Sequence, residues 1–184
     1  MSERLVSPRR SVGLDSRSRW APLALALALA WSCKGPEGPP RGGIEQARAG
    51  AADSLDGLHR AAAEANETAY FDLFAPNAVF LGTDPAERWT LEEFRAWAHP
   101  HFESGKGWSY SVVERHLELA PDLATAWFDE RLSNASYGEC RGTGVLRRFD
   151  GGWKVAQYNL TIPVPNELAG ELVRQIRESA PAAH

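Results

Sequence analysis

The sequence has few of the groups by which covalent or metal chemistry is most easily recognised. Among its 184 residues are two cysteines, five histidines and one methionine. Cys33 and Cys140 lie far apart, so they form neither a disulfide framework nor a Cys-x-x-Cys pair for zinc. No Gly-x-Ser-x-Gly elbow and no glycine-rich phosphate loop occurs. The usual sequence grounds for a serine hydrolase, a P-loop enzyme or a zinc protein are therefore missing.

The main part of the chain also lacks an excess of basic charge. Residues 1–33 hold five arginines against two acidic residues, which leaves 15 basic and 22 acidic side chains in residues 34–184. Nucleic-acid binding needs a basic stripe, and none is present. We therefore expect no nucleic-acid partner.

No apolar run is long enough to span a membrane as a helix. The longest, Trp20–Trp31, follows an arginine-rich segment and has the length of the hydrophobic region of a signal peptide. Ser32 and Cys33 come next, in an arrangement that resembles a bacterial lipoprotein signal, in which the cysteine is lipidated. The alternative is an ordinary secretory signal that is cleaved nearby, with Cys33 incidental or lost.

These features divide the chain into four parts. Residues 1–33 are a predicted signal peptide, 34–43 a tether rich in proline and glycine, 44–178 a folded domain and 179–184 a tail. We expect an exported protein in the bacterial cell envelope, facing the periplasm and anchored by lipid on Cys33. The membrane is a partner only through that anchor.

Helical spacing of apolar residues predicts a helix over 44–66 and a short second helix over 67–75 that ends at Pro76. Thr90 is a predicted N-cap for a third helix, which should falter around Pro100. Residues 167–178 form a predicted final helix.

Strand patterns occupy the stretches between the helices. We expect a short strand at 78–81 and four longer strands, over 108–119, 124–132, 139–149 and 153–162. The order favours an α+β domain in which a curved antiparallel sheet packs on N-terminal helices and encloses a conical cavity. Cys140 is expected to be a small packing residue in the sheet.

Three segments carry a family resemblance: residues 73–97 (LFAPNAVFLGTDPAERWTLEEFRAW), 125–132 (TAWFDERL) and 140–168 (CRGTGVLRRFDGGWKVAQYNLTIPVPNEL). In order and spacing they resemble a SnoaL-like domain of the nuclear transport factor 2-like superfamily. The resemblance implies a conical ligand pocket and a homodimer. Isomerase relatives keep a carboxylate base just after the first strand, where this chain has Gly82, with Asp84 two residues later.

Strand alternation sorts the candidate site residues into faces. The preferred pocket face combines side chains from three strands with a rim after the first strand: Trp127, Asp129, Arg141, Gln157 and Asn159, rimmed by Asp84, Arg88 and Trp89. Asp129 and Arg141 have an alternative interpretation as a structural ion pair. Asp84 has an alternative interpretation as a turn residue before Pro85.

The sequence favours a domain that binds a small hydrophobic or amphiphilic organic molecule, since no catalytic set is evident and no cofactor is implied. Two alternatives stay open. One is a cofactor-independent isomerase, cyclase or hydratase with Asp84 or Asp129 as general base. The other is an oligomerisation or interaction module of the envelope. His99 and His101 are expected to be solvent-exposed rather than metal ligands, so no metal site is predicted.

Overall fold

The structure is a computed structural model that describes residues 41–179. The predicted signal peptide, Cys33, most of the tether and most of the tail lie outside this range. None of the helices between residues 41 and 179 combines the length and apolarity that a membrane span requires. The described elements are α1 (Arg41–Ala63), α2 (Glu67–Asp72), β1 (Phe74–Leu81), β2 (Arg88–Thr90), α3 (Leu91–Glu103), β3 (Ser111–Leu119), β4 (Thr125–Asn134), β5 (Gly138–Phe149), β6 (Gly152–Thr161) and α4 (Asn166–Ser179).

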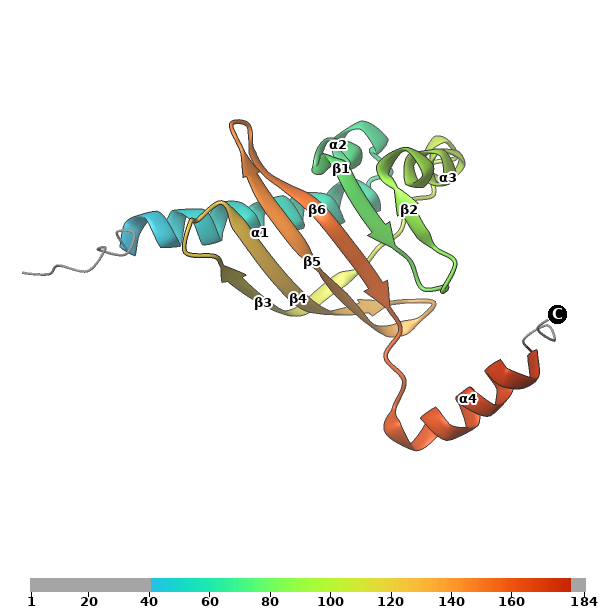
Figure 1. The fold of residues 1–184 in the computed structure, drawn as a ribbon. Coiled ribbons are helices and arrows are strands. Elements are labelled where there is room, and N and C mark those ends of the chain that lie inside the picture. Colours follow the sequence, from blue (N-terminus) through green and yellow to red (C-terminus); the bar gives the residue numbers. More distant parts are fainter. Residues whose placement is uncertain (1–40, 180–184) are drawn as a thin grey trace, which may run out of the picture. The chain divides into compact units, whose positions relative to one another are not determined.

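The strands form one sheet in the order β2-β1-β6-β5-β4-β3. All neighbouring pairs are antiparallel except β1 and β6, which run parallel. Helix α1 packs on β3 and β6, and α3 packs on β1 and β2. Figure 1 shows α1 crossing behind the long strands and α2 and α3 together beside β1. The α+β class, the curved sheet and the flanking helices are as the sequence predicts.

Several details differ from the predicted elements. Helix α2 ends at Asp72, because Phe74 already begins β1, which is twice as long as expected and runs through Pro76. The β1–β6 register is interrupted between Phe74 and Val79, so the missing amide hydrogen of Pro76 falls where the ladder is irregular. Helix α3 does not falter at Pro100 but continues to Glu103.

Thr90 starts α3 as predicted, with a complete capping box. The Thr90 side chain accepts a hydrogen bond from the Glu93 amide, and the Glu93 carboxylate accepts one from the Thr90 amide at 2.8 Å. The strand β2, which the sequence analysis missed, is the short segment that leads into this cap. The cap therefore fixes where Trp89 leaves the sheet and where α3 begins.

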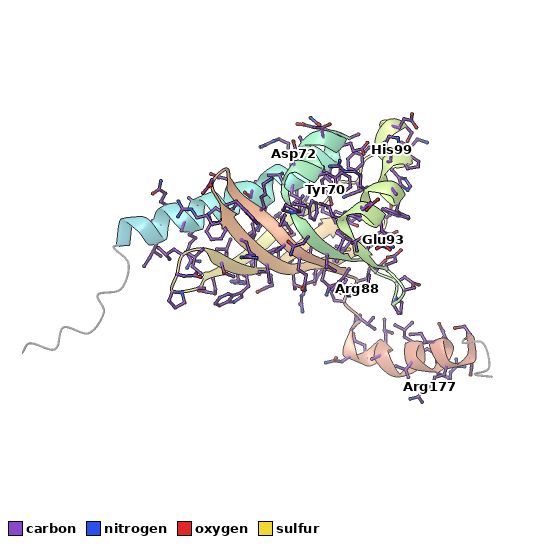
Figure 2. All side chains as sticks on the ribbon, turned by 45° about the horizontal axis from the view of Figure 1, so that its top comes forward. Tyr70, Asp72, Arg88, Glu93, His99 and Arg177 are labelled. Atoms are coloured by element: carbon purple, nitrogen blue, oxygen red, sulfur yellow. The ribbon has the colours of Figure 1, made fainter. Side chains whose placement is uncertain are left out.

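The core lies between the helices and one face of the sheet. Its aromatic centre comes from α2, β1 and α3, where Tyr70, Phe71, Phe74 and Phe94 are all at most 3% exposed. Figure 2 shows Tyr70 among the side chains packed between α2 and α3. Burying such rings supplies much of the hydrophobic stabilisation of a small domain. Cys140 is also fully buried in the sheet, as predicted.

Candidate functional site

The sheet face that packs on the helices is the opposite of the one expected to line a cavity. In β4 the buried residues are Ala126, Phe128, Glu130 and Leu132. Trp127 is 50% exposed, and Asp129 and Arg141 are exposed beside it on the outer face. The prediction that these three residues line the cavity is wrong. Within residues 41–179 no ion pair joins Asp129 to Arg141, which lie opposite Thr143 and Arg131 in the β4–β5 register, so their structural interpretation also fails.

A β-bulge changes the alternation in β6. Val145 pairs with Gln157, but Leu146 pairs with Val155, so Ala156 is an extra residue on β6. Because of the bulge, the next inward-facing residue after Val155 is Tyr158 and not Gln157. Gln157 is exposed and Asn159 is half-buried, and neither lines the pocket described below. A strict period of two could not foresee this shift.

The turn after β1 contributes one of the three predicted rim residues. Trp89 is half-buried and lines the pocket, whereas Asp84 and Arg88 are exposed and do not. Figure 2 shows Arg88 near the hairpin that joins β1 to β2. The Asp84 carboxylate accepts a hydrogen bond from the Ala86 amide at 2.8 Å, which makes it a turn residue.

The pocket opens between α3, the β1–β2 turn and the inner face of the sheet, with a volume of about 320 Å³. Its walls are mainly aromatic and its mouth carries a few polar groups. The lining residues are Phe80, Gly82, Thr83, Glu87, Trp89, Phe94, Trp97, His101, Lys106, Gly107, Trp108, Tyr110, Tyr137 and Leu160. Such a volume is in the range of small-molecule sites.

The aromatic rings along one wall are nearly parallel. Phe80 lies 14° from the plane of Phe94 with centroids 3.9 Å apart, and 5° from that of Tyr158. Trp97 stacks on Trp89 with centroids 5.0 Å apart. Stacked ring pairs of this kind stabilise the wall beyond the apolar area that they bury.

A second, water-sized void of about 20 Å³ adjoins the inner end of the pocket. The two spaces share Phe80, Trp108, Tyr110 and Leu160 as walls. The void adds three polar residues that were not selected as site residues from the sequence: His59 of α1, Tyr70 of α2 and Tyr158 of β6.

Behind the void lies Glu130, the single charged side chain that is fully buried within residues 41–179. Its Oε1 atom lies 2.7 Å from His59 Nε2 and accepts a hydrogen bond from the Tyr158 hydroxyl at 3.0 Å. Its Oε2 atom accepts one from Arg115 Nε at 2.8 Å. Arg115, opposite Glu130 on β3, also donates to Asp56 of α1 at 2.8 Å. The carboxylate is thus paired and hydrogen-bonded, as a buried charge requires.

These contacts set the protonation states. Burial raises the pKa of Glu130, but the hydrogen bonds and charges of His59 and Arg115 outweigh it and hold that pKa below its usual value. Burial, together with the Glu130 charge, raises the pKa of Tyr158 far above its usual value. Burial is also the main cause that raises the pKa of Tyr110 to about 12. Near neutral pH the site holds a carboxylate and protonated phenols.

Sequence signals for this cluster existed. His59 is four residues after Leu55 and next to Leu58, so a titratable ring lies on the apolar stripe of the first helix. Glu130 shares its strand face with Ala126, Phe128 and Leu132, which is the more apolar of the two faces. The predicted pocket face was the one with more polar groups, although the apolar face is the one that a sheet buries.

The histidines near Pro100 are exposed, as predicted. His99 Nδ1 lies 2.8 Å from a carboxylate oxygen of Glu67, which raises the His99 pKa. His101 lies at the pocket mouth, with its ring 5.0 Å from that of Trp97. Nowhere in residues 41–179 do three or more His, Cys, Asp or Glu side chains gather in a metal-binding arrangement.

Comparison with known proteins gives a family and a fold. The family model described as SnoaL-like domain matches residues 52–165. A search of curated proteins finds no match.

Several solved structures are similar to this one at low sequence identity. An NTF2-like protein of unknown function from Pseudomonas putida has a TM-score of 0.55 and 14% identity, over 67% of this chain and 91% of the other. An NTF2-like protein from Streptomyces avermitilis, proposed to be a dehydratase, has a TM-score of 0.58 and 12% identity. The match covers 66% of this chain and 99% of the other. A protein from Novosphingobium aromaticivorans, proposed to be an aromatic ring hydroxylase, has a TM-score of 0.55 and 17% identity. The match covers 66% of this chain and 92% of the other. At these identities the similarity concerns the fold.

Proposed function

The chain belongs to the SnoaL-like domain family, and we propose that it binds a small planar organic molecule in the pocket between α3 and the sheet. The observation that carries this proposal is the aromatic wall formed by Phe80, Trp89, Phe94, Trp97 and Trp108 around a space of about 320 Å³. Concave sites with apolar walls and a few polar groups are the usual form of a ligand site.

The pocket carries a few polar side chains among its aromatic walls. They are Thr83, Glu87, His101, Lys106, Tyr110 and Tyr137, of which Tyr110 also borders the adjoining void. A ligand with a flat hydrocarbon body and one oxygen function matches this lining. The bicyclic aromatic ketone 2-tetralone has both features and is a suitable probe.

Two tryptophan variants test the proposal. Trp97 lines the pocket and is 46% exposed, while Trp127 is 50% exposed on the outer sheet face. Trp97→Ala should weaken 2-tetralone binding about tenfold or more, whereas the matched control Trp127→Ala should leave it unchanged. Binding is followed by thermal shift and by tryptophan fluorescence. Equal effects of the two substitutions would contradict the pocket assignment.

An enzymatic role is the second candidate, but its base would differ from the residues selected by sequence. The carboxylates of Asp84 and Asp129 are exposed and outside the pocket lining. An isomerase, cyclase or hydratase that uses either of them would need its substrate to bind elsewhere.

An interaction role has a separate basis in α4. No residue of this helix is buried, and its apolar side chains Leu168, Leu172, Val173 and Ile176 are all exposed. We propose that this face supports homodimerisation or contact with an envelope protein. Light scattering on Leu172→Asp, compared with the wild type, tests it: a mass that does not change would count against a role in self-association.

Export and lipid attachment are part of the same proposal. They rest on the arginine-rich start, the apolar run of Trp20–Trp31 and the placement of Cys33. A lipid tether would hold the ligand-binding domain at a membrane surface of the cell envelope.

A further inference from the structure

Among the residues that line the pocket, Glu87 is the acidic one. It is half-buried and lines the pocket together with Trp89, whereas Arg88 between them is exposed and lies outside the lining. Side chains two residues apart in an extended segment point to the same face. The chain that leads into β2 therefore brings a carboxylate and an indole ring into the same space.

Gly82 makes room for this carboxylate. A Cβ atom at residue 82 would collide with the Glu87 carboxylate and would lie 2.9 Å from the Glu87 Cβ atom. The two residues also pair through the backbone, where the Gly82 amide donates to the Glu87 carbonyl at 2.8 Å. The turn between β1 and β2 thus holds the acidic side chain over a glycine that also lines the pocket.

The protein satisfies this carboxylate only in part. Within residues 41–179 it accepts one hydrogen bond, from the Asp84 amide to Oε2 at 3.1 Å, and it forms no ion pair. A carboxylate has about four acceptor sites, so most of them are left to solvent. A ligand that fills the pocket removes that solvent, and the dehydrated charge is then costly unless the ligand supplies a positively charged donor.

The aromatic walls add to the same preference. Trp89, Trp97 and Trp108 all line the pocket. The face of an aromatic ring attracts a cation, and tryptophan does so best. The basic side chains of the lining, His101 and Lys106, are exposed, so they keep their own hydration when the pocket is filled. The half-buried carboxylate and the indole rings therefore set the charge preference of the space.

We propose that the ligand of this pocket carries a protonated amine, which binds the Glu87 carboxylate and lies against the tryptophan rings. The inference rests on the proposed binding function and names the chemical class of the ligand, a flat hydrocarbon body with an alkylammonium group. Glu87 is then the residue that determines charge specificity. A charge-assisted hydrogen bond is about twice as strong as a neutral one, so the carboxylate should discriminate between cationic and neutral ligands.

Three compounds with one bicyclic skeleton test the inference by calorimetric titration near neutral pH. They are the cation 2-aminotetralin, the neutral ketone 2-tetralone and the anion of tetralin-2-carboxylic acid. The wild-type protein should bind the amine about tenfold more tightly than the ketone, and the acid most weakly. A higher salt concentration should weaken binding of the amine but not of the ketone.

A charge-neutral variant assigns the preference to one residue. Glu87→Gln keeps the size of the side chain and an oxygen that can accept from the Asp84 amide, but it removes the charge. It should lower the affinity for 2-aminotetralin about tenfold, to the level of 2-tetralone, and leave the ketone affinity unchanged. Glu92→Gln on α3 is the matched control, because Glu92 is exposed and outside the pocket lining. It should bind all three compounds like the wild type.

The outcomes separate this inference from the binding function. Equal wild-type affinities for the amine and the ketone, or tightest binding of the acid, would overturn the charge preference and leave the pocket as a ligand site. A loss of amine binding in Glu92→Gln as large as that in Glu87→Gln would overturn the role of Glu87. Binding of none of the three compounds would overturn both proposals.

Discussion

Tyr158 donates a hydrogen bond to Glu130 across 3.0 Å, although β5 lies between their two strands. The bond is possible because Gly142 of β5 has no side chain. A Cβ atom there would collide with the Tyr158 hydroxyl and would lie 3.0 Å from Glu130 Oε1. The site therefore depends on a glycine that is opposite Glu130 in the β4–β5 register and opposite Leu160 in the β5–β6 register.

Replacing this glycine should damage the cluster. Gly142→Ala is expected to lower the free energy of unfolding by about 1–3 kcal/mol, because the added methyl group forces Tyr158 or Glu130 out of place. The control is Gly151→Ala in the β5–β6 hairpin, where no atom lies within 4 Å of the added Cβ. Its effect should stay within about 0.5 kcal/mol. Urea unfolding measures both, and equal stabilities would show that Gly142 is not a required gap.

Removing the buried carboxylate should be more costly. Glu130→Ala leaves Arg115 half-buried without its main partner, and we expect a loss of about 3–5 kcal/mol in the free energy of unfolding. Asp129→Ala changes the neighbouring exposed carboxylate on the same strand and should cost less than about 1 kcal/mol. Chemical denaturation of the two variants measures both free energies of unfolding. Similar losses would mean that the buried network contributes little.

The same network predicts an acid limb of stability. The Glu130 pKa is lower in the folded protein than in the unfolded chain, so the unfolded state binds the extra proton first. The resulting stability is present above the unfolded pKa and is lost as the pH falls through the folded pKa. Unfolding measured from about pH 6 to about pH 3 should show a steep loss for the wild type and a shallower one for Glu130→Gln. Parallel curves would assign the loss to other groups, such as the exposed Glu93.

Lipid attachment can be tested apart from the domain. In bacteria that express the full chain and are fed radiolabelled palmitate, the wild-type protein should be labelled and Cys33→Ala should not. Cys140→Ala is the matched control, because this buried thiol lies inside the sheet. Labelling of Cys33→Ala at the wild-type level would refute the lipoprotein interpretation and leave an ordinary secretory signal.

Most of the fold followed from local patterns, whereas the site depended on two tertiary features. The strands and the capped α3 helix were predicted because alternation, turn residues and the Thr90 cap are local signals. The inner face of the sheet was not predicted, since alternation defines two faces but does not show which of them is buried. The bulge at Ala156 is set by pairing with both β1 and β5, and it brings Tyr158 rather than Gln157 inside. His59 and Glu130 are 71 residues apart, so only the folded chain reveals their contact.

The most direct test of the central claim is a crystal structure of the protein soaked with 2-tetralone. The account predicts the bicyclic ring in the pocket between α3 and the sheet, against Trp97 and Trp108. Ligand density confined to the outer sheet face near Trp127, or an empty pocket under conditions in which the ligand quenches fluorescence, would contradict it.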